Sequence, residues 1–135
     1  MKGFEHKDQF NKKLNKNTKK INPSKEQILT RAFKFHSQGN ISEAAKYYQS
    51  FIKQGFLDAK VFSNFGVLLQ GLGKLKEAEF YIRKAIELNP NYYLAHSNLG
   101  GILKDLGKLK EAEFYIRKAI ELNPNSPDAY SNLGI

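Results

Sequence analysis

The stretch that decides the fold is LGKLKEAEFYIRKAIELNPN, residues Leu72–Asn91. The same twenty residues recur unchanged at Leu106–Asn125, 34 positions further along the chain. Self-similarity at a fixed period of about 20–50 residues is typical of repeat proteins, in which each unit buries its apolar face by stacking on its neighbours. The sequence therefore predicts a stacked-repeat architecture, and any function has to be argued from the surface of such a stack.

Each copy belongs to a 34-residue unit made of two helix-length stretches. Apolar residues recur at helical spacing in both stretches, and glycines or an Asn-Pro pair separate one stretch from the next. In the first unit, Ser24 is placed to cap a helix, with Gln27 as its capping-box partner. Gly39 interrupts the helical pattern, and Ser42 is predicted to open the second helix. The predicted units are a degenerate one at 25–58, full ones at 59–92 and 93–126, and the start of a truncated one at 127–135.

Composition favours a soluble protein with a basic arm. The chain has 135 residues, no cysteine and a net charge of +9. Eight lysines and two acidic residues give the first 25 residues a net charge of +6, so the rest carries only +3. Residues 1–22 are predicted to be a flexible arm, because blocks of like charge usually stay solvated. No apolar run reaches the roughly 20 residues of a membrane helix, and no signal peptide is recognisable, so a cytoplasmic location is expected.

The pattern of the units resembles the tetratricopeptide repeat (TPR), a helix–turn–helix motif of about 34 residues. The matching signature residues are Gly66, Ala78 and Pro90 in the second unit, and Gly100, Ala112 and Pro124 in the third. The first unit keeps Ala32 and Ala44 in register but has Phe56 where the family places proline. The small residues suggest that large side chains would push the paired helices apart. The resemblance covers about residues 25–135 and implies an all-α fold, a right-handed α-solenoid of antiparallel helix pairs.

In the TPR family, the first helix of each pair lines a concave groove that binds a peptide or a partner helix. The resemblance therefore implies that the binding residues of this chain lie on its first helices. The polar candidates are Lys60, Ser63, Asn64, Gln70, Ser97, Asn98, Lys104 and Asn132. The predicted function is a protein-interaction or scaffold module without catalytic activity of its own, and its partner is a protein or peptide that the sequence does not identify.

Three of these candidates recur at one position of the repeat. Asn64, Asn98 and Asn132 are each followed by an apolar residue and a glycine. A side-chain amide offers an acceptor and two donors, so a row of asparagines can bind a peptide backbone independently of its sequence. This arrangement resembles the asparagine ladder in the repeats of O-linked N-acetylglucosamine transferases. The alternative is that asparagine is simply a frequent polar residue of this helix.

Other chemistries find little support in the sequence. The carboxylate clamp of chaperone-binding TPR proteins needs Lys and Asn in the first unit, where this chain has Leu29 and Phe33. The resemblance therefore does not imply binding to the acidic C-terminus of a chaperone. The three histidines lack the spacing of metal ligands, and the stretch 71–73 is a turn rather than a phosphate loop. No catalytic residue, metal or cofactor is expected.

Two alternatives to the scaffold hypothesis stay open. In this family such arrays often precede a catalytic domain, so the chain could present substrates to a glycosyl-, methyl- or sulfotransferase. The less favoured alternative is that the Lys-rich arm binds nucleic acid or an acidic membrane, although it contains few aromatic residues. The sequence also stops within a first helix, whereas a repeat array usually needs a polar cap. Unless further repeats follow, we expect self-association through the C-terminal face, around Leu133 and residues 114–120.

Overall fold

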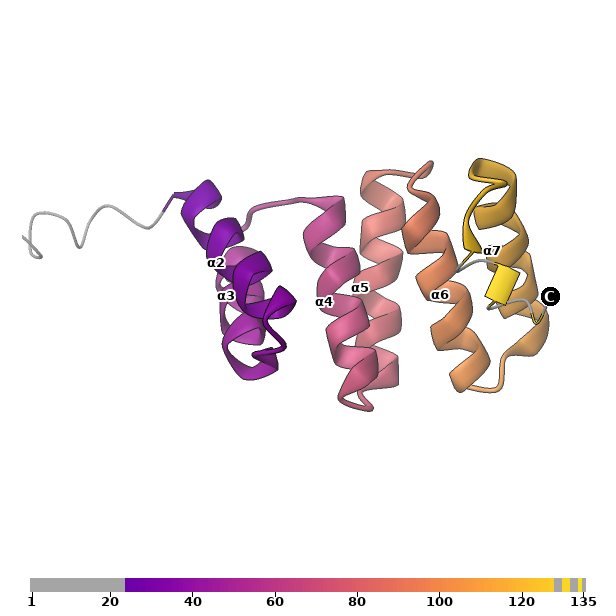
Figure 1. The fold of residues 1–135 in the computed structure, drawn as a ribbon, viewed down its shortest axis with the longest axis horizontal. Helices are drawn as coiled ribbons and strands as arrows, with labels where there is room; N and C mark the ends of the chain where they lie inside the picture. Colours follow the sequence, from indigo (N-terminus) through magenta and orange to yellow (C-terminus); the bar gives the residue numbers. More distant parts are fainter. Residues whose placement is uncertain (1–23, 128–129, 132–133, 135) are drawn as a thin grey trace, which may run out of the picture.

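Between residues 25 and 122, six helices form antiparallel pairs that stack side by side. The computed structural model describes residues 24–127, 130–131 and 134. The helices are α2 (Lys25–Ser37), α3 (Ile41–Lys53), α4 (Ala59–Gly71), α5 (Leu75–Leu88), α6 (Tyr93–Asp105) and α7 (Leu109–Leu122). In Figure 1 the pairs α2–α3, α4–α5 and α6–α7 follow one another along the long axis of the molecule. The predicted all-α solenoid is confirmed, and none of the described helices has the length and apolarity needed to span a bilayer.

Side-chain caps fix where two of the first helices begin. The Ser24 hydroxyl accepts a hydrogen bond from the Gln27 amide at 3.2 Å, and the Gln27 side chain accepts one from the Ser24 amide at 3.0 Å. These two bonds complete the predicted capping box. Asp58 caps α4 in a simpler way, because its carboxylate accepts from the Val61 amide at 3.1 Å.

The second helix of the first pair begins one residue earlier than predicted. The sequence pattern placed its start at Ser42, but α3 begins at Ile41, because the Asn40 side chain caps the helix by accepting from the Glu43 amide. Gly55 then ends α3 with a φ of 83°, in the left-handed region that glycine adopts at little cost.

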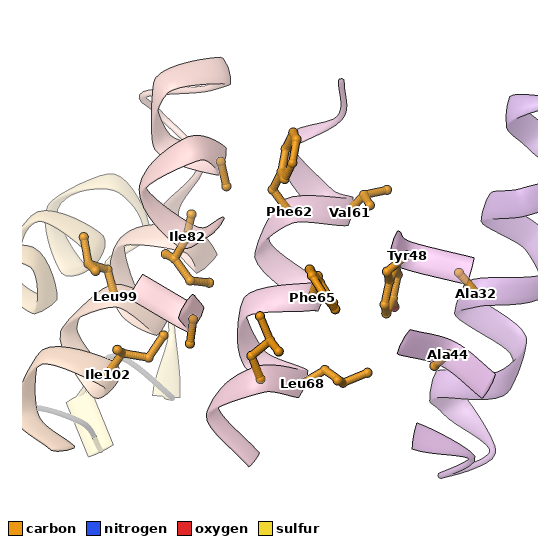
Figure 2. Close-up of a cluster of buried hydrophobic side chains, with 14 of the residues drawn as sticks. Ala32, Ala44, Tyr48, Val61, Phe62, Phe65, Leu68, Ile82, Leu99 and Ile102 are labelled. Carbon is orange, nitrogen blue, oxygen red and sulfur yellow. The ribbon is translucent and has the colours of Figure 1, made fainter. Parts of the chain in front are cut away.

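The core runs through the stack as apolar side chains shared between neighbouring pairs. Tyr48 of α3 and Phe65 of α4 are both buried, and their ring centroids lie 5.9 Å apart (Figure 2). Between the second and third pairs, Ile82 of α5 and Leu99 of α6 belong to the same buried cluster. Full burial of one such side chain contributes about 1.5–3 kcal/mol, so stacking supplies much of the stability of each pair.

Within the second and third pairs, the two helices approach closely at a glycine. A Cβ atom at Gly66 of α4 would lie 2.5 Å from the Ile82 side chain and 3.2 Å from the Ala78 carbonyl oxygen of α5. Gly100 of α6 meets Ile116 of α7 in the same way. The sequence predicted an approach to the small residue of the second helix. The structure adds that isoleucine side chains fill the space that a larger residue would need.

The first pair joins the second through a turn that differs from the later ones. Pro90 and Pro124 follow the last turns of α5 and α7, whereas Phe56 stands at the corresponding place after α3. The Phe56 ring packs on the buried ring of Phe51, with the centroids 5.3 Å apart. An aromatic contact therefore takes the place of the proline turn at the end of the first pair.

Replacing Gly66 by alanine is expected to lower the free energy of unfolding by about 1–3 kcal/mol, because the new methyl group would overlap Ile82. Gly71→Ala is the matched control, since Gly71 is also helical but a Cβ there has nothing within 4 Å. Alanine favours helix, so this control should leave stability unchanged or raise it by up to about 1 kcal/mol. Urea denaturation measures both values, and equal losses would contradict a close approach at Gly66.

Candidate functional site

Polar side chains connect the first helices of successive pairs. Gln70 of α4 donates from Nε2 to the Asp105 carboxylate of α6 at 2.9 Å. Asn98 of α6 donates from Nδ2 to the Ser63 hydroxyl of α4 at 3.1 Å. These bonds place predicted groove residues of two units beside one another. We call this surface the groove face and define it by Phe33, His36, Lys60, Asn64, Gln70 and Asn98.

Asn98 is held in a fixed orientation by a buried hydroxyl group. Ser63 is almost completely buried, and its Oγ accepts the hydrogen bond from the Asn98 amide. One amide hydrogen is therefore used inside the protein, while the carbonyl oxygen and the second hydrogen are left for a ligand. An amide oriented in advance loses less conformational entropy when it binds.

A cavity of about 270 Å³ opens beside Asn64. Its lining residues are Phe33, His36, Ser37, Tyr48, Lys60 and Asn64. The Lys60 ammonium lies 4.8 Å from the centroid of the Phe33 ring, which is a cation–π distance. Pockets for whole small molecules usually measure roughly 300–1,000 Å³, so this cavity suits one side chain of a bound peptide better than a cofactor.

Tyr48 and His36 form a polar contact in this cavity. His36 Nδ1 and the Tyr48 hydroxyl oxygen lie 2.7 Å apart. Burial raises the pKa of Tyr48 to about 12, and the polar side chain of Asn64 acts in the opposite direction. Burial also lowers the pKa of His36 below its ordinary value of 6.5. Both groups are therefore uncharged at neutral pH, and they line the cavity together with Asn64.

The predicted groove residues lie at different depths. Ser63 and Ser97 are almost completely buried, so they lie beneath the groove face rather than on it. Lys104 is exposed near the end of α6. Asn132 lies outside the described residues. The described part of the ladder therefore consists of two asparagines, Asn64 on α4 and Asn98 on α6, which we call its rungs.

His96 occupies a packing position. It is buried between helices, and its Nε2 lies 2.7 Å from the Pro90 carbonyl oxygen. Its ring stacks on Tyr115 with the centroids 5.9 Å apart. Among the residues that the structure describes, no three His, Cys, Asp or Glu side chains are grouped so that they could hold a metal ion.

A larger cavity, of about 530 Å³, lies between the second helices α5 and α7. Its lining residues are Phe80, Arg83, Lys84, Ile86, Glu87, Pro90 and Tyr115. Arg83 donates from Nη2 to Glu111 at 2.6 Å and from Nη1 to the Tyr115 hydroxyl at 3.1 Å. It also donates from Nε to Glu79 at 3.0 Å, an i,i+4 contact within α5. Arg83 therefore ties two units together on this side of the stack.

These partners keep the Arg83 side chain positively charged. Burial alone would lower the pKa of Arg83, but its hydrogen bonds to Glu111, Glu79 and Tyr115 raise that pKa above the ordinary value. The contacts with α7 escaped the sequence reasoning because they join residues 28 and 32 positions apart. The sequence did contain a signal for these contacts, because the copied stretch repeats the arginine, the glutamate and the tyrosine at fixed offsets.

Comparison with known families agrees with this architecture. Two models described as tetratricopeptide repeat match the chain, one at residues 59–92 and the other at residues 93–126. Together these matches cover just over half of the chain. The chain is thus a helical-repeat protein, and it belongs to the tetratricopeptide repeat family. A search of curated proteins found no match.

Several solved structures are similar. The first TPR domain of Spaghetti (RPAP3), bound to an HSP90 peptide, is 26% identical, with a TM-score of 0.75 over 84% of this chain and 93% of that chain. The second TPR domain of human RPAP3, in complex with an HSP70 peptide, is 26% identical, with a TM-score of 0.73 over 79% and 89%. An O-GlcNAc transferase of Thermobaculum terrenum is 22% identical, with a TM-score of 0.76 over 81% of this chain and 21% of that chain. This last likeness shows the fold alone.

Arg83 and Arg117 occupy the same place in the two copies but have different neighbours. Each pairs with a glutamate of its own helix, but the Arg83 side chain also reaches Glu111 and Tyr115 of α7 and is 37% exposed, whereas the Arg117 side chain is 63% exposed. Arg83→Gln is expected to lower the free energy of unfolding by about 1 kcal/mol more than Arg117→Gln, because charge-assisted hydrogen bonds between units are lost. Urea denaturation of both variants measures the difference. Equal losses would mean that the contacts with Glu111 and Tyr115 do not stabilise the stack.

Proposed function

We propose that this chain is a protein-interaction module that binds an extended peptide segment of a partner on its groove face. The observation that carries the proposal is the pair of rungs, Asn64 and Asn98, at one repeat position on neighbouring first helices. Both side chains are half-buried; Asn98 donates a hydrogen bond to Ser63 of the preceding unit, and Asn64 lines a cavity together with Tyr48 of the preceding unit. Amides held in this way are suited to the backbone groups of a ligand.

In this proposal, the two asparagines bind the backbone of the peptide and the cavity beside Asn64 binds one of its side chains. An extended peptide carries unpaired backbone N–H and C=O groups, and the free edge of an asparagine amide can pair with one of each. Each such hydrogen bond contributes a net of about 0.5–1.5 kcal/mol. The cavity lined by Phe33 and Lys60 then receives one side chain of the peptide, which supplies selectivity.

The related domains support a peptide ligand without fixing its sequence. The two RPAP3 domains are bound to the peptides SRMEEVD and SGPTIEEVD, which share their last four residues. Here Leu29 and Phe33 stand where the carboxylate clamp requires Lys and Asn, and their side chains have no hydrogen-bond donor. We therefore propose recognition through the peptide backbone and one side chain rather than through a terminal carboxylate.

A substrate-presenting role within a larger transferase is the alternative, and it would use the same groove face. The likeness to the O-GlcNAc transferase covers 21% of that chain at 22% identity, so it supports the fold and not the activity. The Lys-rich arm, residues 1–22, lies outside the described residues. Binding of nucleic acid or membranes by this arm, and a cytoplasmic location, therefore stay proposals.

Peptides selected from a displayed random library against the full chain should bind the double variant Asn64→Ala, Asn98→Ala at least ten-fold more weakly than wild type. The double variant loses the hydrogen bonds of both asparagines to the peptide. At a net of about 0.5–1.5 kcal/mol per hydrogen bond, this loss of binding free energy corresponds to such a drop in affinity. Isothermal titration calorimetry with the selected peptides gives the affinities.

Gln49→Ala is the matched control for this experiment, because it removes an exposed side-chain amide from the second helix α3. Its affinity should equal that of wild type. A peptide ending in Glu-Glu-Val-Asp should bind no better with a free C-terminus than with an amidated one. Unchanged binding by the double variant would show that the rungs do not form the site.

We also propose self-association through the face of α7 that points away from the second pair. Phe114 is 64% exposed, but its equivalent Phe80 is still 55% exposed although another pair follows it, so aromatic exposure alone does not mark a missing neighbour. Arg117 is available for a second copy in this proposal, since its equivalent Arg83 donates to Glu111 and Tyr115 of the next unit. A second copy could offer such partners.

Sedimentation velocity over a wide concentration range should reveal a reversible dimer or higher species. Arg117→Glu is expected to weaken this association, because the reversed charge would repel the acceptors that an arginine attracts. Lys76→Glu, the same charge change at another exposed position, should have little effect. A monomer at every concentration would contradict self-association.

A further inference from the structure

Polar contacts on both sides of the stack join the second helix pair to the third. On the groove face, Gln70 donates to the carboxylate of Asp105, and a second bond runs from Asn98 to Ser63. On the side of the second helices, Arg83 of α5 donates to a carboxylate and a hydroxyl of α7. A hydrogen bond restricts both a distance and an angle, so these contacts hold the two pairs in one relative orientation.

The boundary between the first and second pairs has lost one partner of each of these contacts. Since the period is 34 residues, every residue of a contact has an equivalent 34 positions earlier in the chain. The replaced partners are Gln49 for Arg83, Leu29 for Ser63 and Gly71 for Asp105. An uncharged amide, an aliphatic chain and a hydrogen atom thus stand where the later boundary has a guanidinium, a hydroxyl and a carboxylate.

The turn that crosses each boundary differs in the same sense. Between α5 and α6, Pro90 restricts the backbone, and its carbonyl oxygen lies 2.7 Å from Nε2 of His96. The equivalents between α3 and α4 are Phe56 and Phe62, and a phenyl ring cannot form this bond. The turn also contains Gly55, the residue type with the most backbone freedom.

Apolar packing is what holds the first boundary. The rings of Tyr48 and Phe65 meet across it with their centroids 5.9 Å apart (Figure 2), and Val61 is completely buried beside them. Hydrophobic attraction depends on the area removed from water and has no preferred direction. Packed helices joined in this way can slide or rotate by small amounts, which directional bonds would oppose.

The cavity on the groove face lies across this boundary. The first pair contributes Phe33, His36, Ser37 and Tyr48 to its lining, and the second pair contributes Lys60 and Asn64. The Lys60 ammonium approaches the Phe33 ring from the other pair, at 4.8 Å from the centroid. A rotation of the first pair relative to the second therefore changes the width of the cavity.

We propose that residues 54–58 are a hinge and that the first pair closes on the side chain that a bound peptide places in the cavity. The closure rests on the proposed peptide-binding function of the groove face. The second and third pairs keep their arrangement, because their polar contacts stay in place. The cavity thereby adapts to side chains of different size, while Asn98 presents a fixed amide to the peptide backbone.

The hinge is tested first on the chain without ligand, by electron paramagnetic resonance between pairs of spin labels. The sequence has no cysteine, so two introduced cysteines can be labelled selectively. Ser42→Cys with Lys76→Cys reports on the first boundary, and Lys76→Cys with Lys110→Cys reports on the second. These three positions are exposed and equivalent on successive second helices. The first label pair should give the broader distribution of distances, and equal widths would overturn the hinge.

Restoring a lost contact should stiffen the first boundary. Gln49→Arg places a guanidinium opposite Glu77 and Tyr81, the equivalents of the two α7 residues that Arg83 contacts. The distance distribution between labels at positions 42 and 76 should become narrower. Adding Glu77→Ala to this variant removes the carboxylate and should return most of the original width. A distribution that Gln49→Arg leaves unchanged would show that the missing contacts do not cause the mobility.

Adding a library-selected peptide tests the closure. At saturation, the distribution between positions 42 and 76 should narrow, whereas the distribution between positions 76 and 110 should stay as it was. A peptide that binds in calorimetry without narrowing the first distribution would overturn the closure and leave the peptide-binding function intact. If no library peptide binds, the proposed function is overturned instead, and the distributions of the free chain still decide whether residues 54–58 are a hinge.

Discussion

The close contact between the two helices of a pair, made possible by Gly66 and Gly100, is the constraint on which the rest of the structure depends. Without a Cβ on the first helix, an isoleucine of the second helix lies directly against its backbone. Residues such as Ile82 and Leu99 of neighbouring pairs then join one continuous core. Contacts on the opposite side of the first helices thus determine the spacing between the groove residues of successive units.

The copied stretch was enough to predict the fold because helical repeats are encoded locally. The period, the glycines and the capping box of Ser24 each determine structure within a few residues, and the structure follows them. The start of α3 was misplaced by one residue, because Asn40 competes with Ser42 as the capping residue and sequence alone does not rank them. Local signals therefore predict elements better than they predict their ends.

The site was predicted less completely than the fold. Periodicity assigns a residue to a face of a helix but says nothing about its depth, so Ser63 was proposed as a groove contact although it is buried under Asn98. The hydroxyl of the buried Tyr48 meets His36, which lies 12 positions away on another helix. Partnerships of this kind depend on tertiary packing, which a single sequence does not display.

The identity of α5 and α7 has a consequence for how the chain folds. Every contact that α4 makes with the side chains of α5 is available from α7 as well, because the two helices have one sequence. Residues 72–74 separate α4 from α5, whereas residues 72–108 separate it from α7. Closing the longer loop costs on the order of 2 kcal/mol more chain entropy. Chain connectivity, rather than side-chain recognition, therefore decides which of two identical helices pairs with α4.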